Sequence, residues 1–361
     1  MTGAGRAFGA ALLGLVLLIG GLALGTPSLY LPAVALILLG LGAAAWVALA
    51  ASGAGLDRTA GPHTVEEDQP WPITLAVRPG AAPAPAGELV EPLLGQPLPA
   101  GVGAPARVRV DVRFERRGRR RIEPARLTIR DPLGLAERTV ESDPAEVVVL
   151  PRIHPVLAPG AAATGRIGAR TARPVAESAE VEIDGLRPYR AGVPASRIHW
   201  PAVARRGELV ERRVVADSDS RPLVILDARR PPDEDALDRA VRAAASLSVH
   251  LARGGGCALL LPGDRRPADV DAELRAWPAL HVRLALVEAD SRPPAAGRVE
   301  RTGGVFWVTA CPGVPSGLAR LSAGERWVVS PSGDAAPPGG FTVAGCTGRR
   351  LGRTAAAARA A

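Results

Sequence analysis

AFGAALLGLVLLIGGLALG (residues 7–25) and LYLPAVALILLGLGAAAWVALAA (residues 29–51) are two apolar stretches near the N-terminus, and neither contains a charged residue. They are 19 and 23 residues long, and an α-helix needs about 20 apolar residues to cross the hydrocarbon core of a bilayer. Only Thr26, Pro27 and Ser28 separate them, so the two helices must be antiparallel neighbours. The sequence therefore predicts a transmembrane helical hairpin over residues 7–51.

The residues that flank the hairpin predict its orientation. Arg6 precedes the first stretch, Arg58 follows the second, and the turn between them has no charge. Since positively charged flanks stay on the cytoplasmic side, we expect a multi-pass protein of the cell membrane whose soluble body is cytoplasmic. The alternative is a signal peptide cleaved after Ala23-Leu24-Gly25, which would leave one membrane span.

The composition argues against several classes of enzyme. All 44 basic residues among the 361 are Arg, and a chain without Lys has neither a Walker lysine for ATP phosphates nor Schiff-base chemistry. The sequence also lacks HExxH and GxSxG motifs. Cys257, Cys311 and Cys346 lie in or beside apolar runs without CxxC spacing, so we expect three reduced core residues. We predict no catalytic residues and no cofactor.

Residues 57–151 have the pattern of a small β-sandwich. Short β-type runs are separated by turn residues, with no helical period between them; these runs are Ile73–Arg78, Val108–Glu115, Arg126–Arg130 and Val147–Leu150. Residues 107–121 contain eight Arg. Because the arginines at its start alternate with apolar residues, we interpret this segment as a half-buried strand with a solvated outer face; an anionic docking surface is the alternative.

Residues 221–346 have a different pattern, typical of an α/β domain. An apolar run, Pro222–Leu226, ends at Asp227, and a helix-period segment, Leu237–Leu251, follows it. Further along the chain the predicted elements are a strand over 257–261, a helix over 270–277, and strands over 282–287, 305–309 and 327–329. Strands alternating with helices predict a doubly wound parallel sheet covered on both faces. Residues 152–220 are predicted to connect the domains, and residues 347–361 to be a flexible tail.

The connection contains a recognisable segment, RPYRAGVPASRIHWPAVARRGELVER (residues 187–212). It resembles the signature of the domain of unknown function 58 family. DPLGL (131–135) and VLPRI (149–153) are similar to that family's two other landmarks, in the same order. The resemblance implies a von Willebrand factor A-like domain that starts at residues 221–227. It also implies a partner, because members are often encoded beside MoxR-type AAA+ ATPases and are suspected of acting with them in maturing envelope and metal-containing proteins.

Two positions depart from the family pattern. The family usually has Asp after the Gly of its signature, where this chain has Val193. Metal-binding von Willebrand A domains end their first strand with Asp-x-Ser-x-Ser, whereas this chain has Asp227, Arg229 and Pro231 at those three positions. A hard divalent ion needs oxygen ligands, so we predict no metal site here. Instead, we expect Asp227 to pair with Arg229 or to contact a helix N-terminus. Asp264 and Asp290 are further candidates, because ligands of open α/β sheets bind beyond the strand ends.

The signature segment is the predicted partner-binding site. Its aromatic residues and arginines combine the residue types that dominate contact hot spots; the candidates are Arg187, Tyr189, Arg190, Arg197, Trp200, Arg205 and Arg206. The other interpretation is that these arginines hold the segment to acidic residues of its own domain, such as Glu208 or Glu211.

These observations predict a membrane-anchored, non-enzymatic scaffold or adaptor that binds protein partners, with a MoxR-type AAA+ ATPase as a candidate partner. The net charge of +8 leaves an Arg-rich binder of nucleic acid or anionic lipid as the first alternative. Nucleic acid is the less favoured ligand, because no stacking aromatic residues are interleaved with the arginines. An unrecognised hydrolase is the second alternative.

The orientation can be tested with reporter fusions. A reporter placed after Ala361 should be cytoplasmic, and one placed in the Thr26–Ser28 turn should be external, because the positive flanks stay inside. An external C-terminal reporter would contradict the predicted orientation. The loss of about 25 residues in an intact-mass measurement would instead favour the cleaved signal peptide.

Overall fold

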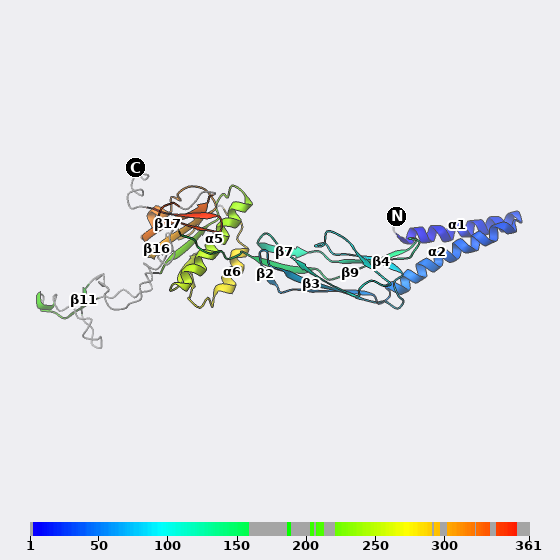
Figure 1. The fold of residues 1–361 in the computed structure, drawn as a ribbon, viewed down its shortest axis with the longest axis horizontal. Helices are drawn as coiled ribbons and strands as arrows, with labels where there is room; N and C mark the ends of the chain where they lie inside the picture. Colours follow the sequence, from blue (N-terminus) through cyan, green and yellow to red (C-terminus); the bar gives the residue numbers. More distant parts are fainter. Residues whose placement is uncertain are drawn as a thin grey trace. The chain divides into compact units, whose positions relative to one another are not determined.

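The computed structural model describes residues 3–158, 186–188, 203–205, 207–212, 221–290, 292–296, 302–321, 323–332 and 337–351. The chain divides into two compact units, Met1–Val149 and Leu150–Ala361, whose elements are drawn in Figure 1. The first unit holds two helices and a set of small sheets, and the second holds one large sheet with helices.

Two apolar helices open the first unit, as predicted. They are α1 (Gly3–Leu24) and α2 (Tyr30–Ala51), joined by the 3-10 turn η1 (Pro27–Leu29). The helices are closely packed, since a Cβ on Gly14 would lie 2.6 Å from the carbonyl oxygen of Ala33 and one on Gly40 would lie 2.5 Å from that of Ala7. Small residues allow such an approach between apolar helices.

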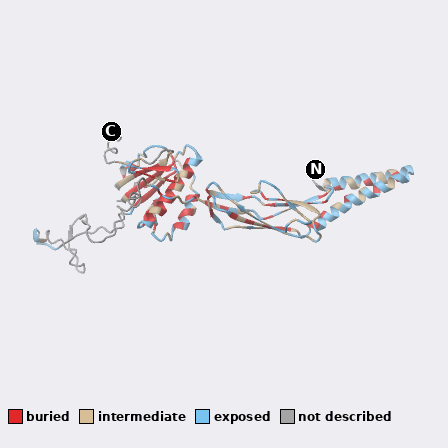
Figure 2. Ribbon diagram, in the orientation of Figure 1, coloured by how far each residue is buried: buried red, intermediate tan, exposed pale blue. Residues whose placement is uncertain are grey.

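The outer surfaces of these helices are apolar. Figure 2 shows that much of both helices is exposed, and large side chains such as Leu24 and Leu31 are 74% and 83% accessible. Both helices are long and apolar enough to cross a membrane. Side chains of this kind need an apolar surrounding, because exposing them to water costs about 25 cal/mol per Å².

Ten strands follow within residues 55–150. They are β1 (Gly55–Ala60), β2 (Thr64–Glu66), β3 (Trp71–Arg78), β4 (Ala86–Val90), β5 (Leu98–Ala100), β6 (Arg107–Val112), β7 (Gly118–Ile122), β8 (Arg126–Arg130), β9 (Glu137–Glu141) and β10 (Ala145–Leu150). They form three sheets with the orders β1-β3-β6, β2-β10-β7 and β5-β4-β8-β9. The pairs β1-β3, β3-β6, β7-β10, β4-β5, β4-β8 and β8-β9 are antiparallel. Buried residues of all three sheets, among them Trp71, Ile129 and Val147, belong to one hydrophobic core.

The four predicted strands of this region correspond to β3, β6, β8 and β10. The other six were not predicted, because they are short or lack a run of alternating apolar residues. In β9, for example, four of the five residues are exposed and one is partly buried. Such a strand is held by pairing with its neighbour, here β8, and pairing leaves no periodic apolar pattern.

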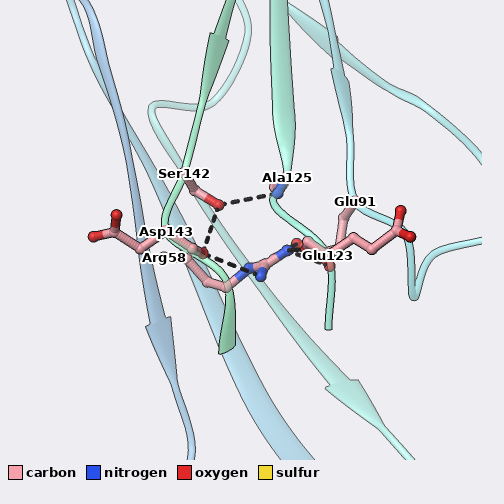
Figure 3. A network of polar contacts seen from close by, with 6 residues as sticks. All are labelled: Arg58, Glu91, Glu123, Ala125, Ser142 and Asp143. Carbon is pink, nitrogen blue, oxygen red and sulfur yellow. Dashed lines mark hydrogen bonds and ion pairs between the residues drawn. The ribbon is translucent and has the colours of Figure 1, made fainter. Parts of the chain in front are cut away.

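A buried ion pair lies among these sheets (Figure 3). Arg58 Nη2 lies 2.8 Å from Glu91 Oε2, and each side chain is only 1% exposed. The same guanidinium donates to the carbonyl oxygens of Glu123, at 2.7 Å, and Asp143, at 3.3 Å. It thereby joins β1 to the turns that follow β4, β7 and β9. A buried charge is tolerated when its donors are satisfied in this way.

The ion pair gives Arg58 a structural role in the folded chain. Arg58 is the predicted positive flank of the second helix, but in the folded chain its charge is buried and neutralised by Glu91. Its contribution to orientation is therefore confined to the unfolded chain during insertion. The cytoplasmic location of the body remains a prediction.

The second unit contains a seven-stranded sheet with the order β15-β14-β13-β16-β17-β19-β18. Its strands are β13 (Leu223–Asp227), β14 (Cys257–Leu260), β15 (Ala268–Val270), β16 (Thr302–Thr309), β17 (Ala323–Pro331), β18 (Phe341–Val343) and β19 (Cys346–Arg350). The four central strands, β14, β13, β16 and β17, are parallel. The outer strands pair in antiparallel fashion. A mixed sheet thus replaces the purely parallel one that we expected.

Helix α5 (Glu234–Arg253) contains the predicted helix-period segment, Leu237–Leu251, and extends beyond it at both ends. The carboxylate of its N-cap residue, Asp233, accepts a hydrogen bond of 2.6 Å from the amide of Ala236, and Gly254 ends the helix. Its apolar face and that of α6 (Trp277–Ala285) share a core with Val224 and Phe306 of the sheet. The opposite face of the sheet is covered, in the described residues, by the 3-10 turn η5 (Leu318–Arg320) and the segment around Ala296. The described α-helices therefore cover one face of the sheet, not two.

Two predicted elements are wrong, the helix over 270–277 and the strand over 282–287. Residues 268–270 form the edge strand β15, the helix starts only at Trp277, and residues 282–285 continue that helix instead of forming a strand. Pro278 in the first turn favours a helix start at this point, and a short apolar run cannot by itself distinguish strand from helix. The predicted tail also begins too early, since β19 extends to Arg350; residues 352–361 lie outside the described residues.

The buried ion pair generates a stability prediction. Arg58→Met should lower the free energy of unfolding by about 3–5 kcal/mol, because it leaves the Glu91 carboxylate buried without a partner. The control is Arg126→Met, whose partner Glu141 is 52% exposed; this change should cost less than about 1 kcal/mol. Pulse proteolysis of the detergent-solubilised chain across a urea series can follow cleavage in residues 55–150. Equal losses in the two variants would contradict the prediction.

Candidate functional site

The candidate site of the second unit is a cleft at the carboxyl ends of two adjacent parallel strands. Strands β13 and β16 pair so that Asp227 lies opposite Thr309. The cleft has a volume of about 280 Å³, and it is lined by the ends of these strands and the loops that follow them. The lining residues are Asp227, Arg229, Arg230, Thr309, Cys311, Pro312, Gly313, Val314 and Pro315. Sheets of this kind bind ligands at this position.

Asp227 is placed here by the sequence of β13, whose five residues are all buried. The apolar run fixes the strand in the middle of the sheet, and the carboxylate follows at its end, only 2% exposed. A buried carboxylate needs hydrogen-bond donors, and the surroundings of Asp227 provide them.

Four N–H groups donate to the two oxygens of Asp227. Oδ1 accepts from the backbone N–H of Arg229, at 3.2 Å, and from its Nε, at 2.8 Å. Oδ2 accepts from Arg229 Nη2, at 2.7 Å, and from the indole Nε1 of Trp307, at 3.0 Å. An ionised carboxylate offers about four lone-pair sites. These four donors occupy all of them.

The predicted ion pair between Asp227 and Arg229 is thus present. Hydrogen bonding by the Arg229 guanidinium to the Asp227 carboxylate is the main cause that raises the pKa of Arg229 above its ordinary value, against the opposing effect of burial. The guanidinium therefore stays charged throughout the physiological pH range.

Trp307 is the partner of Asp227 that sequence reasoning missed. It lies two residues before the strand end on β16, so the alternation of a strand puts it on the same face as Thr309.

Two arginines give the cleft its positive charge. Arg229 uses only its Nε and Nη2 for Asp227, and its side chain is 31% exposed. Arg230 is exposed, has no ion pair within the described residues, and has a φ of 43°. A non-glycine residue rarely adopts this left-handed conformation, and such residues cluster at ligand-binding positions. With Asp227 neutralising one of them, the two arginines leave one positive charge at the cleft.

The other strand-end carboxylates have their own partners. Asp264 accepts a hydrogen bond of 2.6 Å from Arg283 Nη2, and Asp290 accepts one of 2.9 Å from the amide of Arg292. Asp290 lies beside the end of β13, where its amide donates to the carbonyl oxygen of Ala228. It follows α6, however, and not the strand that we predicted. Within the described residues, no three His, Cys, Asp or Glu side chains form a group that could hold a metal ion.

The cysteines differ in environment. Cys257 and Cys346 are buried, and burial is the main cause that raises the pKa of each thiol to about 12. They are core residues, as predicted, and their thiols stay protonated at neutral pH. The prediction is wrong for Cys311, which is partly exposed and lines the cleft.

The signature segment falls mostly outside the described residues, which exclude Tyr189, Arg190, Arg197, Trp200 and Arg206. Arg187 lies in β11 (Leu186–Pro188), which pairs with β12 (Val210–Arg212) so that Arg187 is opposite Glu211. Arg205 lies in a helical turn, residues 203–205, and is exposed. The partner site predicted on this segment stays a prediction.

No protein-family model matches this sequence, and no curated protein matches it. One solved structure is similar in part, the PKD domain of an M14-like peptidase from Thermoplasmatales archaeon SCGC AB-540-F20. It is 14% identical, and the match covers 26% of this chain and 94% of that one with a TM-score of 0.18. A similarity of this size supports no argument about fold or function.

The four hydrogen bonds that Asp227 accepts generate the next prediction. Asp227→Asn should lower the free energy of unfolding by about 3–5 kcal/mol, because the amide presents N–H groups to donors and leaves Arg229 without a counter-charge. Asp264→Asn is the matched control. Its ion pair is more exposed, at 21% for Asp264 and 47% for Arg283, and the change should cost about 1 kcal/mol or less. Urea unfolding of the detergent-solubilised chain measures both.

The same experiment examines metal binding. Millimolar Mg²⁺ or Mn²⁺ should leave the unfolding midpoint of the wild type unchanged, since a ligand stabilises only a protein that binds it. A midpoint that rises with Mg²⁺, and no longer does so in Asp227→Asn, would show that Asp227 is a metal ligand.

Proposed function

We propose that this chain is a membrane-anchored, non-enzymatic adaptor whose second unit binds an acidic side chain of a protein partner at the Asp227–Arg229 cleft. The observation that carries the proposal is the complete set of four donors on Asp227. It leaves the cleft without a free carboxylate for acid–base or metal chemistry, while Arg229 and Arg230 line it with guanidinium groups. Guanidinium groups bind carboxylates in a planar, bidentate geometry.

The proposal extends to the fold. We infer that residues 221–346 are a von Willebrand factor A-like domain, as the resemblance to the domain of unknown function 58 family implies, and that residues 57–151 are a β-sandwich, as the pattern of β-type runs predicts. The parallel centre of the large sheet, with a cleft at its carboxyl edge, supports the first assignment. The single core shared by three antiparallel sheets supports the second.

The positions of Arg229 and Arg230 give the proposal a mechanism. In a metal-binding domain of this type, a hard cation held by the strand end would attract a partner's carboxylate. Here the positive charge is part of the chain, so the partner would bind without a metal ion. Asp227, which also accepts a hydrogen bond from Trp307, orients the Arg229 guanidinium, and a preorganised side chain loses less entropy on binding. The partner that the family resemblance favours is a MoxR-type AAA+ ATPase.

Substitution at the cleft separates binding from folding. The double change Arg229→Gln and Arg230→Gln should weaken capture of a MoxR-type ATPase of the same organism by about 2 kcal/mol or more, as expected for a contact hot spot. Because the first change also unpairs Asp227, Arg230→Gln is measured alone as well. Arg230 is exposed, so this variant should keep the wild-type unfolding midpoint and still lose affinity. Capture is measured with the full chain in nanodiscs.

The control is Arg253→Gln, which removes an equally exposed arginine at the opposite end of α5, about 30 Å from its first residue for a 20-residue helix. It should bind as the wild type does. Arg205→Ala, in the signature segment, tests the second candidate surface in the same assay. Capture that Arg230→Gln leaves unchanged would exclude the cleft. A loss with Arg205→Ala alone would place the site on the signature segment.

A further inference from the structure

The first unit has an apolar pocket beside the end of α2. It has a volume of about 220 Å³ and lies between the last turn of α2, represented by Ala50, and loops of the sheets. Its lining is mostly Ala, Gly, Pro, Val, Leu and Ile, with Leu127 and Ile129 of β8 on the side of the core. Among the lining residues, which all belong to the described chain, only Arg78 is charged. Arg78 is 65% exposed and held by Asp57 at 2.8 Å.

One wall of this pocket is fixed to the apolar helix. Two hydrogen bonds hold the loop that contains Gly80 and Pro83 at the end of α2. Trp46 Nε1 donates to the carbonyl oxygen of Pro83, at 3.2 Å, and the amide of Ala81 donates to the carbonyl oxygen of Ser52, at 2.8 Å. Gly80 touches the end of the helix so closely that a Cβ there would lie 2.0 Å from the carbonyl oxygen of Ala50. The loop therefore has a defined position along α2.

That position is the boundary of the apolar segment. Trp46 lies five residues before Ala51, the last residue of α2, which is about 8 Å along a helix. Its side chain is 44% exposed, and Trp residues at the ends of membrane spans lie at the level of the lipid head groups. The loop bonded to Trp46 lies at the same level. A second lining loop carries Val102, which is 76% exposed at its tip and extends the apolar surface beyond the pocket.

The lining of the pocket favours a hydrocarbon occupant. Water needs two to four polar partners in a cavity, whereas an apolar cavity of about 150 Å³ binds a molecule the size of benzene. The pocket is larger than that, and it adjoins a helix whose outer surface is apolar. A chain of methylene groups can therefore continue from the surface of α2 into the pocket.

We propose that this pocket binds one acyl chain of a membrane phospholipid, with Val102 at its rim in contact with the bilayer. The lipid then joins the hairpin to the sheets, because it touches α2 on one side and β8 on the other. The inference does not depend on the adaptor function. It depends on the insertion of the hairpin into a membrane, and the same experiment measures that insertion.

The test uses the full chain reconstituted in phosphatidylcholine vesicles that contain a phosphatidylcholine with a photoreactive diazirine on its acyl chain. Mass spectrometry after irradiation should find label on α1 and α2 and also on residues 77–106. The pocket-filling variants Ala84→Leu and Ala100→Leu should lower the label on residues 77–106 about tenfold or more, because each methylene excluded from an apolar site weakens binding about fourfold. Two independent filling variants are used so that one unfolded variant does not decide the result.

Ala81→Leu is the matched control, since Ala81 is exposed on the same loop and is not a lining residue. It should keep the label, as should the hairpin in every variant. Val102→Asp should lower the label at the rim without changing the unfolding midpoint. Label on α1 and α2 with none on residues 77–106 would overturn the proposal. Label that Ala84→Leu and Ala100→Leu leave unchanged would also overturn it, because the contact would then be with the outer surface. If α1 and α2 carry no label, the hairpin is not inserted in the membrane and the proposal is wrong, whatever the result at the cleft.

Discussion

The N-terminal helices need an apolar surrounding, and the rest of the structure depends on this requirement. No charged residue occurs between Ala7 and Ala51, and the large side chains of both helices face outward. Hydrocarbon is the surrounding in which such a surface costs no free energy. The sheets start immediately afterwards, since β1 begins at Gly55, four residues beyond α2. The first core contains Val47 and Ala50 of α2 together with residues of the sheets, so the boundary of the apolar segment also fixes the position of the fold that follows it.

Each unit also contains a buried carboxylate that an arginine neutralises. Glu91 pairs with Arg58 in the first unit, and Asp227 pairs with Arg229 in the second. Both guanidinium groups bind both oxygens of their partner. A guanidinium offers several donors in a planar fork for such contacts, whereas the ammonium group of a lysine is a point donor.

The sequence predicted those features that have a strong local signal. The hairpin, β13 with Asp227 at its end, and α5 with its stop at Gly254 follow from uninterrupted apolar runs and a helical period. The region 268–287 was predicted wrongly because its apolar runs are short and fit either structure. The burial of Arg58 and the contact from Trp307 to Asp227 could not be predicted, since their partners are 33 and 80 residues distant. Only the tertiary fold brings such residues together.

The pairing of Asp227 has a consequence for the chemistry of the cleft. A strand-end carboxylate with free lone pairs can bind a cation, and the cleft would then be a metal or acid–base site. Once Arg229 and Trp307 occupy those lone pairs, the carboxylate serves to orient the guanidinium. The pair of Asp227 and Arg229 is then neutral as a whole. Arg229, two positions after Asp227, cancels the charge of the carboxylate, and Arg230 adds one positive charge to the cleft; for this reason we propose that the partner is acidic.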